Sequence, residues 1–346
     1  MKAIKITGPG KAEIQEVAVP ALRDDYILVK VKAVALNPTD WKHIDFLSTP
    51  GCTIGCDLAG TIEEVGPKVA KPWKKGDRVA AFTHGANAVQ PEDGCFAEYA
   101  VAKGDLGAKI PDTMTFEQAS SLGVGITTVG QSLYQALRLP LPDSGVATNF
   151  PILIYGGSTA TGTLALQYAK LSGCSPIITT CSPSNFALVK SLGADVAFDY
   201  NDPDVVAKIR TYSSDALTHA LDCISTKETA EITSQSISSK GGQVCYLLNG
   251  TAHSRTDVKA HFTLGYTVMG EYFYFGAGRK IEYDARDEDF EFGKRFWALA
   301  ERLLEEGKVK PHPVEVGEGG LEGVFEGLQA MREGRVSGKK LVYTVG

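Results

Sequence analysis

The stretch with the clearest chemistry is Pro151–Gly162, PILIYGGSTATG. An apolar run of strand type ends in Gly156-Gly157, small residues follow, and a helical pattern opens directly afterwards. This arrangement suits a dinucleotide pyrophosphate, because the turn lets backbone approach the phosphates and the helix end offers unpaired N–H groups. Read as G-x-G-x-x-G, the hexamer runs from Gly157 to Gly162 with Thr159 in place of the middle glycine. The stretch predicts a dinucleotide site; the alternative is an ordinary strand-to-helix turn.

The type of dinucleotide is predicted from the end of the next strand. An NAD-binding unit usually places Asp or Glu about 20 residues past the glycines, to accept a hydrogen bond from the ribose 2′-hydroxyl. This chain has Cys181-Ser182-Pro183-Ser184-Asn185 there, with hydroxyl and amide donors and no carboxylate. A 2′-phosphate would meet no like charge, so the sequence favours NADPH. The alternative is a polar helix cap without a ligand role.

The seven cysteines and six histidines form no evident metal site. The cysteines are scattered through apolar or loop sequence, as in a cytosolic protein with reduced thiols. Cys52-x-x-x-Cys56 has a tolerable spacing for a metal, but no second Cys or His pair follows at zinc spacing. The histidines form no HxxxH or HxH pair. We therefore predict no metal site.

Length and charge restrict the function classes. A chain of 346 residues predicts two domains. The net charge of −6 argues against a nucleic-acid partner. No apolar run approaches the roughly 20 residues that span a bilayer. The N-terminus, MKAIKITGPG, is typical of a strand and a turn rather than a signal peptide. These features predict a cytoplasmic protein that binds neither nucleic acid nor membrane.

Two patterns of secondary structure follow one another along the chain. Residues 1–110 predict short strands separated by turns, typical of a small β barrel or sandwich. Strands are expected at Tyr26–Leu36, Ile54–Val65 and Gly94–Val101, with one more after the turn Gly76–Val79. Helices are expected at Phe116–Leu122 and Thr127–Leu139. From residue 151 to about 270, strands alternate with helices, which predicts βαβ units in a doubly wound parallel sheet.

The expected strands of this second region are 151–155, 176–181, 195–199, 218–223 and 243–248. Its expected helices are 162–172, 184–192, 202–212 and 227–239. Beyond residue 270, the charged segment Lys280–Glu291 is predicted to be a loop. Amphipathic helices are expected at Phe292–Glu306 and Leu321–Met331, and the chain closes on a strand at Lys340–Val345.

A set of short motifs runs along the whole chain. They are Asn37-Pro38-Thr39-Asp40, Gly55-Cys56-Asp57-x-x-Gly60, Val65-Gly66, Gly76-Asp77-Arg78-Val79, Gly94-x-Phe96-Ala97-Glu98-Tyr99 and Gly338-Lys339-Lys340-Leu341-Val342. With them the chain resembles the medium-chain dehydrogenases/reductases, in which a GroES-like β domain is followed by a Rossmann domain and a return to the first. The resemblance implies a GroES-like catalytic domain at residues 1–125, a Rossmann NADP-binding domain at 126–270 and the return at 271–346.

Within this superfamily the resemblance is to the zinc-free branch, with its quinone oxidoreductases and enoyl reductases. The zinc alcohol dehydrogenases have a G-H-E motif that supplies a histidine ligand, where this chain has Gly55-Cys56-Asp57. Their four-cysteine lobe for a structural zinc is also missing between residues 80 and 100.

Longer stretches resemble the fungal trans-acting enoyl reductases of polyketide synthesis. They are NPTDWK (37–42), TFEQASSLGVGITT (115–128), YGGSTATG (155–162), TCSPSN (180–185), GADVAFDY (193–200), ALDCI (220–224), TLGYTVMGE (263–271) and RVSGKKLV (335–342). In that family the phosphate turn is itself S-T-A-T, so Thr159 supports the resemblance.

The resemblance implies two sets of site residues. The NADPH contacts are Pro38, Thr39, Asp40, Trp41, Ser158, Thr159, Ala160, Thr161, Ser182, Pro183, Ser184, Asn185, Tyr200, Leu247, Leu248, Val336 and Ser337. The substrate pocket comprises Thr128, Val129, Gly130, Gln131, Ser132, Leu133, Tyr134, Gln135, Gly265, Tyr266, Thr267, Val268 and Met269.

The reaction implied is hydride transfer from NADPH C4 to the β-carbon of an α,β-unsaturated thioester. The enolate oxygen then needs hydrogen-bond donors in place of a metal. Lys42, Thr128 and the nicotinamide ribose hydroxyl are candidates, and water is expected to protonate the α-carbon. The alternatives are a solvated surface lysine for Lys42 and a helix N-terminal hydroxyl for Thr128.

The implied partner is the acyl-carrier domain of a polyketide synthase or of a polyketide synthase-peptide synthetase hybrid. Lys74, Lys75 and Arg78, or Arg279 and Lys280, are candidates for contacting an acidic carrier domain, and a solvated face is the alternative. The fungal family implies a monomer, whereas the superfamily commonly forms dimers.

Two other functions remain open at this point. One is a quinone or small-enone oxidoreductase that acts on free substrates. The other is a non-catalytic nucleotide-binding protein.

Overall fold

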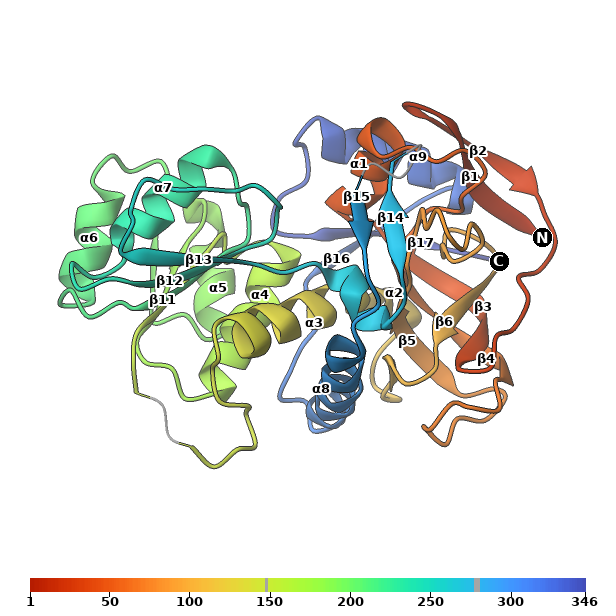
Figure 1. Ribbon diagram of the computed structural model, residues 1–346, viewed down its shortest axis with the longest axis horizontal. Coiled ribbons are helices and arrows are strands. Elements are labelled where there is room, and N and C mark those ends of the chain that lie inside the picture. Colours follow the sequence, from red (N-terminus) through yellow and green to blue (C-terminus); the bar gives the residue numbers. More distant parts are fainter. Residues whose placement is uncertain (147–148, 277–280) are drawn as a thin grey trace. The chain divides into compact units, whose positions relative to one another are not determined.

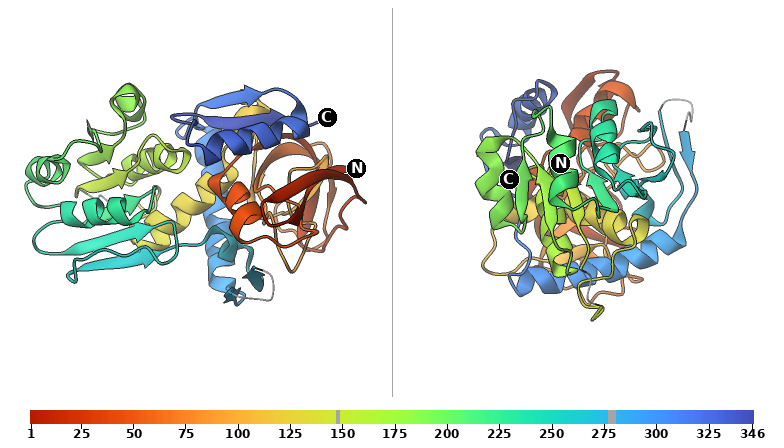
Figure 2. Two further views of the ribbon diagram at one scale, coloured as in Figure 1. Left: turned by 90° about the horizontal axis from the view of Figure 1, so that it is seen from above. Right: turned by 90° about the vertical axis from the view of Figure 1, so that its left-hand side faces the viewer.

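The computed structural model describes residues 1–146, 149–276 and 281–346, which form two compact units. One comprises Met1–Thr127 and Tyr266–Gly346, and we call it the mixed-sheet unit. The other comprises Thr128–Gly265, and we call it the parallel-sheet unit. Both chain termini lie in the mixed-sheet unit (Figures 1 and 2).

The mixed-sheet unit contains mostly short strands. The strands are β1 (Lys2–Gly8), β2 (Lys11–Glu16), β3 (Tyr26–Ala35), β4 (Asp57–Val65), β5 (Arg78–Phe82), β6 (Tyr99–Lys103), β7 (Gly107–Lys109), β14 (Phe273–Phe275), β15 (Ile281–Tyr283), β16 (Val314–Gly317) and β17 (Lys340–Thr344). Its largest sheet has the order β16-β17-β3-β4-β5-β7, with β6 also paired to β3. The β3–β4 register shifts between Leu28 and Val29 and again between Val31 and Ala33. Such irregularities increase strand twist and curl a sheet around its core.

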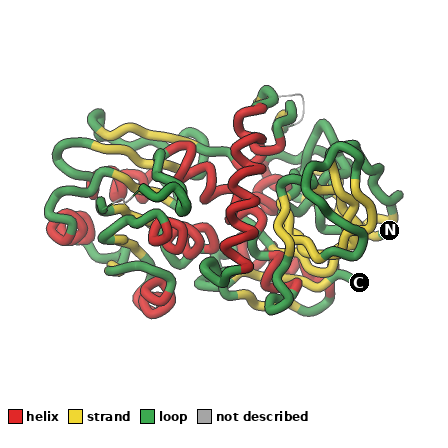
Figure 3. Tube along the Cα trace, turned by 90° about the horizontal axis from the view of Figure 1, so that it is seen from below, coloured by secondary structure: helices red, strands yellow, loops and turns green. Residues whose placement is uncertain are grey.

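The helices of this unit flank the sheet. They are α1 (Pro38–Phe46), α2 (Phe116–Ser120), α8 (Asp287–Glu305) and α9 (Gly320–Arg332), with α3 (Gly123–Val129) running on into the second unit. The long helix α8 is prominent in Figure 3. Among the described residues, no helix is both long enough and apolar enough to cross a membrane.

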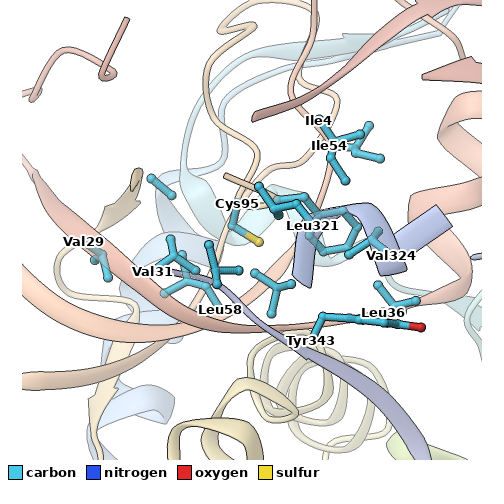
Figure 4. Packing of buried hydrophobic residues seen from close by; sticks show 14 of the residues in the cluster. Ile4, Val29, Val31, Leu36, Ile54, Leu58, Cys95, Leu321, Val324 and Tyr343 are labelled. Carbon is cyan, nitrogen blue, oxygen red and sulfur yellow. The ribbon is translucent and has the colours of Figure 1, made fainter. Parts of the chain in front are cut away.

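The core of the mixed-sheet unit joins segments that are far apart in the sequence. Val29 and Val31 of β3 and Leu58 of β4 pack in one cluster with Leu321 and Val324 of α9 (Figure 4). All five are buried. Burying such side chains contributes about 1.5–3 kcal/mol each. The C-terminal segment is therefore part of the same core as the first strands.

The parallel-sheet unit confirms the predicted doubly wound sheet. Its strands are β8 (Ile152–Tyr155), β9 (Ile177–Thr180), β10 (Val196–Phe198), β11 (His219–Asp222), β12 (Gly242–Tyr246) and β13 (Val258–Phe262). They are all parallel, in the order β10-β9-β8-β11-β12-β13, and β11, β12 and β13 lie side by side in Figure 1. The crossover helices are α4 (Ala160–Leu171), α5 (Phe186–Ser191), α6 (Val205–Tyr212) and α7 (Lys227–Ser236). The chain order reverses between β8 and β11, which is where such sheets bind ligands at their carboxyl ends.

Two expectations about secondary structure were wrong. The segment Lys280–Glu291 is not a loop in its described part, because β15 occupies Ile281–Tyr283 and α8 begins at Asp287. Three acidic residues open α8, and negative charge is favourable at a helix N-terminus. The single helix expected at Thr127–Leu139 is instead α3 followed by a π-helical segment, η1 (Gly130–Ala136).

Candidate nucleotide site and active site

The glycine turn after β8 has the geometry of a phosphate-binding loop. Gly156 has a φ of 77°, which favours glycine, and the N–H groups of Gly156 and Gly157 both donate to the carbonyl of Thr180 on β9. Thr159 is the N-cap of α4. Its Oγ1 accepts from the Gly162 N–H at 2.9 Å and donates to the Gly156 carbonyl at 2.8 Å. The threonine in place of the middle glycine therefore closes the turn onto the helix.

This turn is also packed too closely for larger residues. A Cβ on Gly162 would lie 2.3 Å from the Gly156 carbonyl oxygen, and one on Gly157 would lie 2.0 Å from Thr179 Oγ1. In the described part of the chain, the N–H groups of Ser158, Ala160 and Thr161 donate to no protein acceptor. These free donors at the positive end of α4 fit a diphosphate.

Three exposed apolar side chains follow three strands of the parallel sheet, all at its carboxyl edge. They are Tyr200 after β10, Ile224 after β11 and Leu248 after β12, each about two-fifths exposed. Exposed apolar groups at the carboxyl edge fit the base and ribose of a nucleotide. The hydroxyl groups of Ser182 and Tyr200 lie 3.3 Å apart, so the structure brings these two predicted cofactor residues together.

The loop after β11 is a part of this edge that the sequence interpretation missed. The Asp222 carboxylate accepts from the N–H groups of Ile224 and Ser225 and from Thr229 Oγ1. Ser225 has a positive φ of 62°, and its Oγ accepts from the Leu247 N–H at 2.8 Å. Ile224 lies against Gly156, since a Cβ there would be 3.0 Å from Ile224 Cγ1. In the sequence, the signal for Ile224 and Ser225 was their position directly after a parallel strand.

The carboxylate of Asp199 lies near Cys181, the residue just before the predicted 2′-phosphate contacts, and the sequence did not indicate this. Burial raises the pKa of the Cys181 thiol to about 11, and the negative charge of Asp199 adds to the rise. The Asp199 carboxylate accepts from both the backbone and side-chain N–H groups of Asn201. Of the other predicted residues, Pro183 and Ser184 are exposed and Asn185 is half-buried.

The second group of predicted cofactor residues opens α1 in the mixed-sheet unit. Asn37 is the N-cap, and its N–H donates to Asp40 Oδ2 at 2.7 Å. Trp41 contacts the ring of Phe46 and has Lys42 Nζ 5.7 Å from its own ring centre. Partial burial lowers the pKa of Lys42. Lys42 is thus half-buried rather than the solvated surface lysine that was its alternative.

Tyr266, predicted for the substrate pocket, meets predicted cofactor residue Thr39 in the same unit. Its hydroxyl lies 2.8 Å from Thr39 Oγ1 and 3.3 Å from Cys56 Sγ. Its ring stacks on His84 with 4.1 Å between ring centres. Burial raises the pKa of Tyr266 well above its usual value and lowers the pKa of His43 to about 4, so both groups are uncharged at neutral pH.

The remaining predicted residues are mostly buried. Val129–Tyr134 and Thr267–Met269 are interior, while Thr128 and Gln135 are half-buried. Ser132 Oγ lies 3.1 Å from Thr263 Oγ1, and the Tyr134 hydroxyl lies 2.9 Å from Ser172 Oγ. Leu247 is half-buried, and Gly265 closes the parallel-sheet unit. Val336 and Ser337, next to β17, are half-buried and exposed.

The basic residues considered for carrier contact have different surroundings. Lys75 pairs with Glu63 at 3.0 Å on the surface. Arg78 donates to the carbonyls of Pro111 and Met114, so its side chain is held within its own unit. Lys74 is exposed. Arg279 and Lys280 lie outside the described residues.

Family models match most of the chain. The alcohol dehydrogenase GroES-like domain matches residues 23–112, and the zinc-binding dehydrogenase model matches residues 160–279. The sequence is 47% identical to trans-enoyl reductase ACTTS2 of Alternaria alternata, over 99% of this chain and 98% of that one. It is also 47% identical to trans-enoyl reductase resD of Aspergillus sclerotiorum over all of both chains. This chain belongs to the trans-enoyl reductase family. It is thereby a member of the medium-chain dehydrogenase/reductase superfamily, as the sequence motifs predicted.

Solved structures share the fold of this trans-enoyl reductase family member. An alcohol dehydrogenase superfamily protein from Novosphingobium aromaticivorans is 21% identical with a TM-score of 0.82, covering all of both chains. The CurK enoyl reductase is 18% identical with a TM-score of 0.75, covering all of this chain and 99% of that one. A mycobacterial protein complexed with NADPH is 20% identical with a TM-score of 0.75, covering 99% of both. The GroES-like and Rossmann folds expected from the sequence are confirmed.

Within the described residues of this reductase, no ligand set matches the zinc in the name of the second family model. Cys56, which replaces the histidine of the G-H-E motif, contacts the Tyr266 hydroxyl. Among the residues described, no three His, Cys, Asp or Glu side chains are grouped so that they could hold a metal ion. The donors present therefore do not fit zinc, and no step of the mechanism is assigned to it.

Asp40 gives this family member a testable pH dependence. Burial raises the pKa of Asp40 to about 7. The folded state then binds this proton more tightly than the unfolded state, so the Asp40 contribution to stability falls as pH rises from about 4 to about 7. The whole rise corresponds to about 4 kcal/mol. Asp40→Asn is expected to gain stability over wild type at pH 8 and to lose that advantage at pH 4. Urea unfolding at both pH values checks this, and an equal difference at both pH values would contradict it.

Proposed function

We propose that this protein is an NADPH-dependent trans-enoyl reductase that reduces the α,β-unsaturated thioester of a carrier-bound polyketide intermediate. The observation that carries the substrate class is the 47% identity, over essentially full lengths, to two proteins named trans-enoyl reductases. The closed glycine turn with its free N–H groups supports the dinucleotide. In this proposal residues 126–270 bind NADP, and residues 1–125 and 271–346 form the catalytic domain.

The nucleotide is held by the parallel-sheet unit along its carboxyl edge. Ser158–Thr161 bind the diphosphate through N–H groups and hydroxyls. Ser182–Asn185 and Tyr200 bind the 2′-phosphate through hydroxyl and amide donors. Leu247 and Leu248 contact the apolar faces of the nucleotide base and ribose. Ile224, which was not predicted from the sequence, contributes to the same surface. Pro38–Trp41 and Val336-Ser337 are the further contacts, contributed by the mixed-sheet unit.

The bound cofactor supplies a hydride to the β-carbon of the enoyl thioester. The protein must then stabilise negative charge on the thioester oxygen with hydrogen-bond donors. Lys42, which is half-buried and has a pKa lowered by that burial, is the first donor. The Thr128 hydroxyl is the second donor. The α-carbon receives its proton from water, and Thr128–Gln135 with Gly265–Met269 line the acyl chain.

The protein works in trans on the acyl-carrier domain of a polyketide synthase or of a synthase-peptide synthetase hybrid, as a monomer in the cytoplasm. A carrier domain binds the reductase by contacts remote from the reacting carbons. Such remote binding energy raises kcat/KM for a tethered substrate over a free one.

Comparison of three substrate classes tests this function. We expect NADPH oxidation with carrier-bound enoyl thioesters to have a kcat/KM at least about tenfold above that with free enoyl thioesters. Rapid NADPH oxidation with quinones and none with enoyl thioesters would favour the free-substrate oxidoreductase instead. Tight NADPH binding without any turnover would favour the non-catalytic protein. Parallel assays with NADH in place of NADPH test the nucleotide preference. This comparison is needed because the negative charge of Asp199 lies close to Cys181.

Replacing Lys42 tests its role as a donor. Lys42→Gln is expected to lower kcat by about tenfold, less than a fully buried oxyanion donor would, because the side chain is only half-buried. The KM for NADPH is expected to change little. Lys11→Gln, at an exposed lysine of β2 with no proposed role, is the matched control. A Lys42→Gln enzyme with wild-type kcat would show that Lys42 is not a donor.

A further inference from the structure

A buried ion pair joins the first residue of β17 to the first residue of β4. Lys340 Nζ lies 2.5 Å from Asp57 Oδ2, and the two side chains are 4% and 0% exposed. Removing two charges from water is costly, and only good geometry with additional hydrogen bonds offsets that cost. The reaction described above uses neither group. The burial of this ion pair is therefore not explained by the proposed hydrogen-bond donors, Lys42 and Thr128.

The additional hydrogen bonds of Asp57 reach two helix starts. Its Oδ2 also accepts from Asn37 Nδ2 at 2.9 Å, and its Oδ1 accepts from the Val124 N–H at 2.5 Å. Asn37 is the N-cap of α1, and Val124 lies in the first turn of α3. One carboxylate thus holds the beginnings of two helices that are nearly ninety residues apart in the sequence.

On the α1 side, this network uses a side chain that helices normally use for capping. An N-cap asparagine usually accepts from an N–H of the first helical turn. Here the Asn37 Oδ1 also accepts from Lys340 Nζ, at 2.8 Å. The side chain is thereby fixed by Lys340 and Asp57 together. The residues that follow it directly are Pro38–Trp41, the proposed cofactor contacts.

On the α3 side, the carboxylate leaves no space at the helix start. A Cβ on Gly123 would lie 2.5 Å from Asp57 Oδ1 and 2.6 Å from the Ala81 carbonyl oxygen. Lys340 Nζ also lies 3.5 Å from the Ser121 carbonyl, at the end of α2 just before this point. Thr128, the proposed second donor, lies in the last turn of α3.

We propose that Asp57, with Lys340 as its counter-charge, is a positioning residue of the reductase. Its Oδ2, through Asn37, orients the α1 segment that contacts the cofactor. Its Oδ1, through Val124, orients the α3 segment that carries Thr128. The inference rests on the proposed function, because the roles of both segments come from there.

Variants that break one arm at a time test the proposal. Asn37→Ala removes the α1 arm and is expected to weaken NADPH binding about tenfold, with kcat at saturating NADPH nearly unchanged. Val124→Pro removes the N–H of the α3 arm, in a first helical turn, where proline is tolerated. It is expected to lower kcat about tenfold with an unchanged Kd for NADPH. Fluorescence titration measures the Kd without requiring turnover.

The neutral double variant Asp57→Asn/Lys340→Met separates positioning from stability. It leaves no unpaired buried charge, so its melting temperature should stay near wild type. Its single amide oxygen can accept from one arm only, so at least one of the two quantities, the Kd for NADPH or kcat, should be impaired. Lys339→Met, at the exposed neighbour that pairs with Glu315 on the surface, is the control.

The outcomes distinguish this inference from the proposed function. A stable double variant with wild-type Kd and kcat would overturn the positioning role. If the double variant does not fold, the single-arm variants decide: separate effects on Kd and kcat support the role, and wild-type values of both overturn it. Failure of the proposed function has a different signature, namely a wild-type protein that neither binds NADPH nor reduces enoyl thioesters.

Discussion

Gly162→Ala is expected to weaken NADPH binding severely. The added Cβ would lie 2.3 Å from the Gly156 carbonyl oxygen and 2.7 Å from Gly157 Cα, which are backbone atoms that cannot move aside as a side chain does. The start of α4 must then separate from the turn, and the N–H groups of Ser158, Ala160 and Thr161 no longer converge. Hydrogen bonds to charged groups contribute about 1.5–3 kcal/mol each, so losing two weakens binding by at least about a hundredfold. Fluorescence titration with NADPH measures this.

Gly8→Ala is the matched control for this glycine substitution. A Cβ on Gly8 meets nothing within 4 Å, and Gly8 lies in β1, outside the glycine turn. This variant is expected to bind NADPH as wild type does. If Gly162→Ala bound NADPH with the wild-type Kd, the glycine turn would not be the diphosphate site.

Lys340→Met is expected to lower the free energy of unfolding strongly. This change leaves the fully buried Asp57 carboxylate with its hydrogen bonds from Asn37 and Val124 but without a counter-charge. Breaking a buried pair by removing one partner costs about 3–5 kcal/mol, a large part of the stability of an ordinary domain. The free energy of unfolding in urea at pH 7 measures this loss.

Two comparisons identify the cause of that loss. The double variant Asp57→Asn/Lys340→Met should recover most of the stability, since neither charge then remains buried alone. Lys75→Met, which breaks the surface pair with Glu63, should cost less than about 1 kcal/mol. If the single and double variants were equally unstable, packing of the lysine stem would explain the loss, and the buried charge would not.

The sequence predicted the parallel-sheet unit well because local pattern determines it. Its first five strands are short runs rich in apolar residues, and each crossover helix follows within a few residues. The sixth strand, β13, was not predicted, because its VKAHF sequence is mostly exposed and has no apolar run. Helix α1 was missed for the opposite reason. Its buried residues are Asp40, His43 and Ile44, so two of the three are polar and no apolar periodicity is visible. Tertiary hydrogen bonds, rather than an apolar face, fix that helix.

The same distinction holds for the candidate site. Local sequence predicts some of its residues, and contacts between distant segments are not predictable in this way. The glycine turn and the strand-end residues follow from local spacing, as does the absence of an acidic residue among residues 181–185. The link between Thr39 and Tyr266 joins residues 227 positions apart, and the Lys340–Asp57 pair joins residues 283 apart. No local pattern contains such contacts. Ile224 was missed because an apolar residue after a strand has no distinguishing type.

Transfer of deuterium from labelled NADPH shows directly whether the protein reduces an enoyl thioester by hydride transfer. NADPH carrying deuterium at the transferred C4 position is incubated with the protein and a carrier-bound enoyl thioester in ordinary water, and the product is examined by mass spectrometry. We expect one deuterium at the β-carbon and a solvent proton at the α-carbon. A saturated product without deuterium at the β-carbon, or no reduction of any enoyl thioester while NADPH binds, would contradict it.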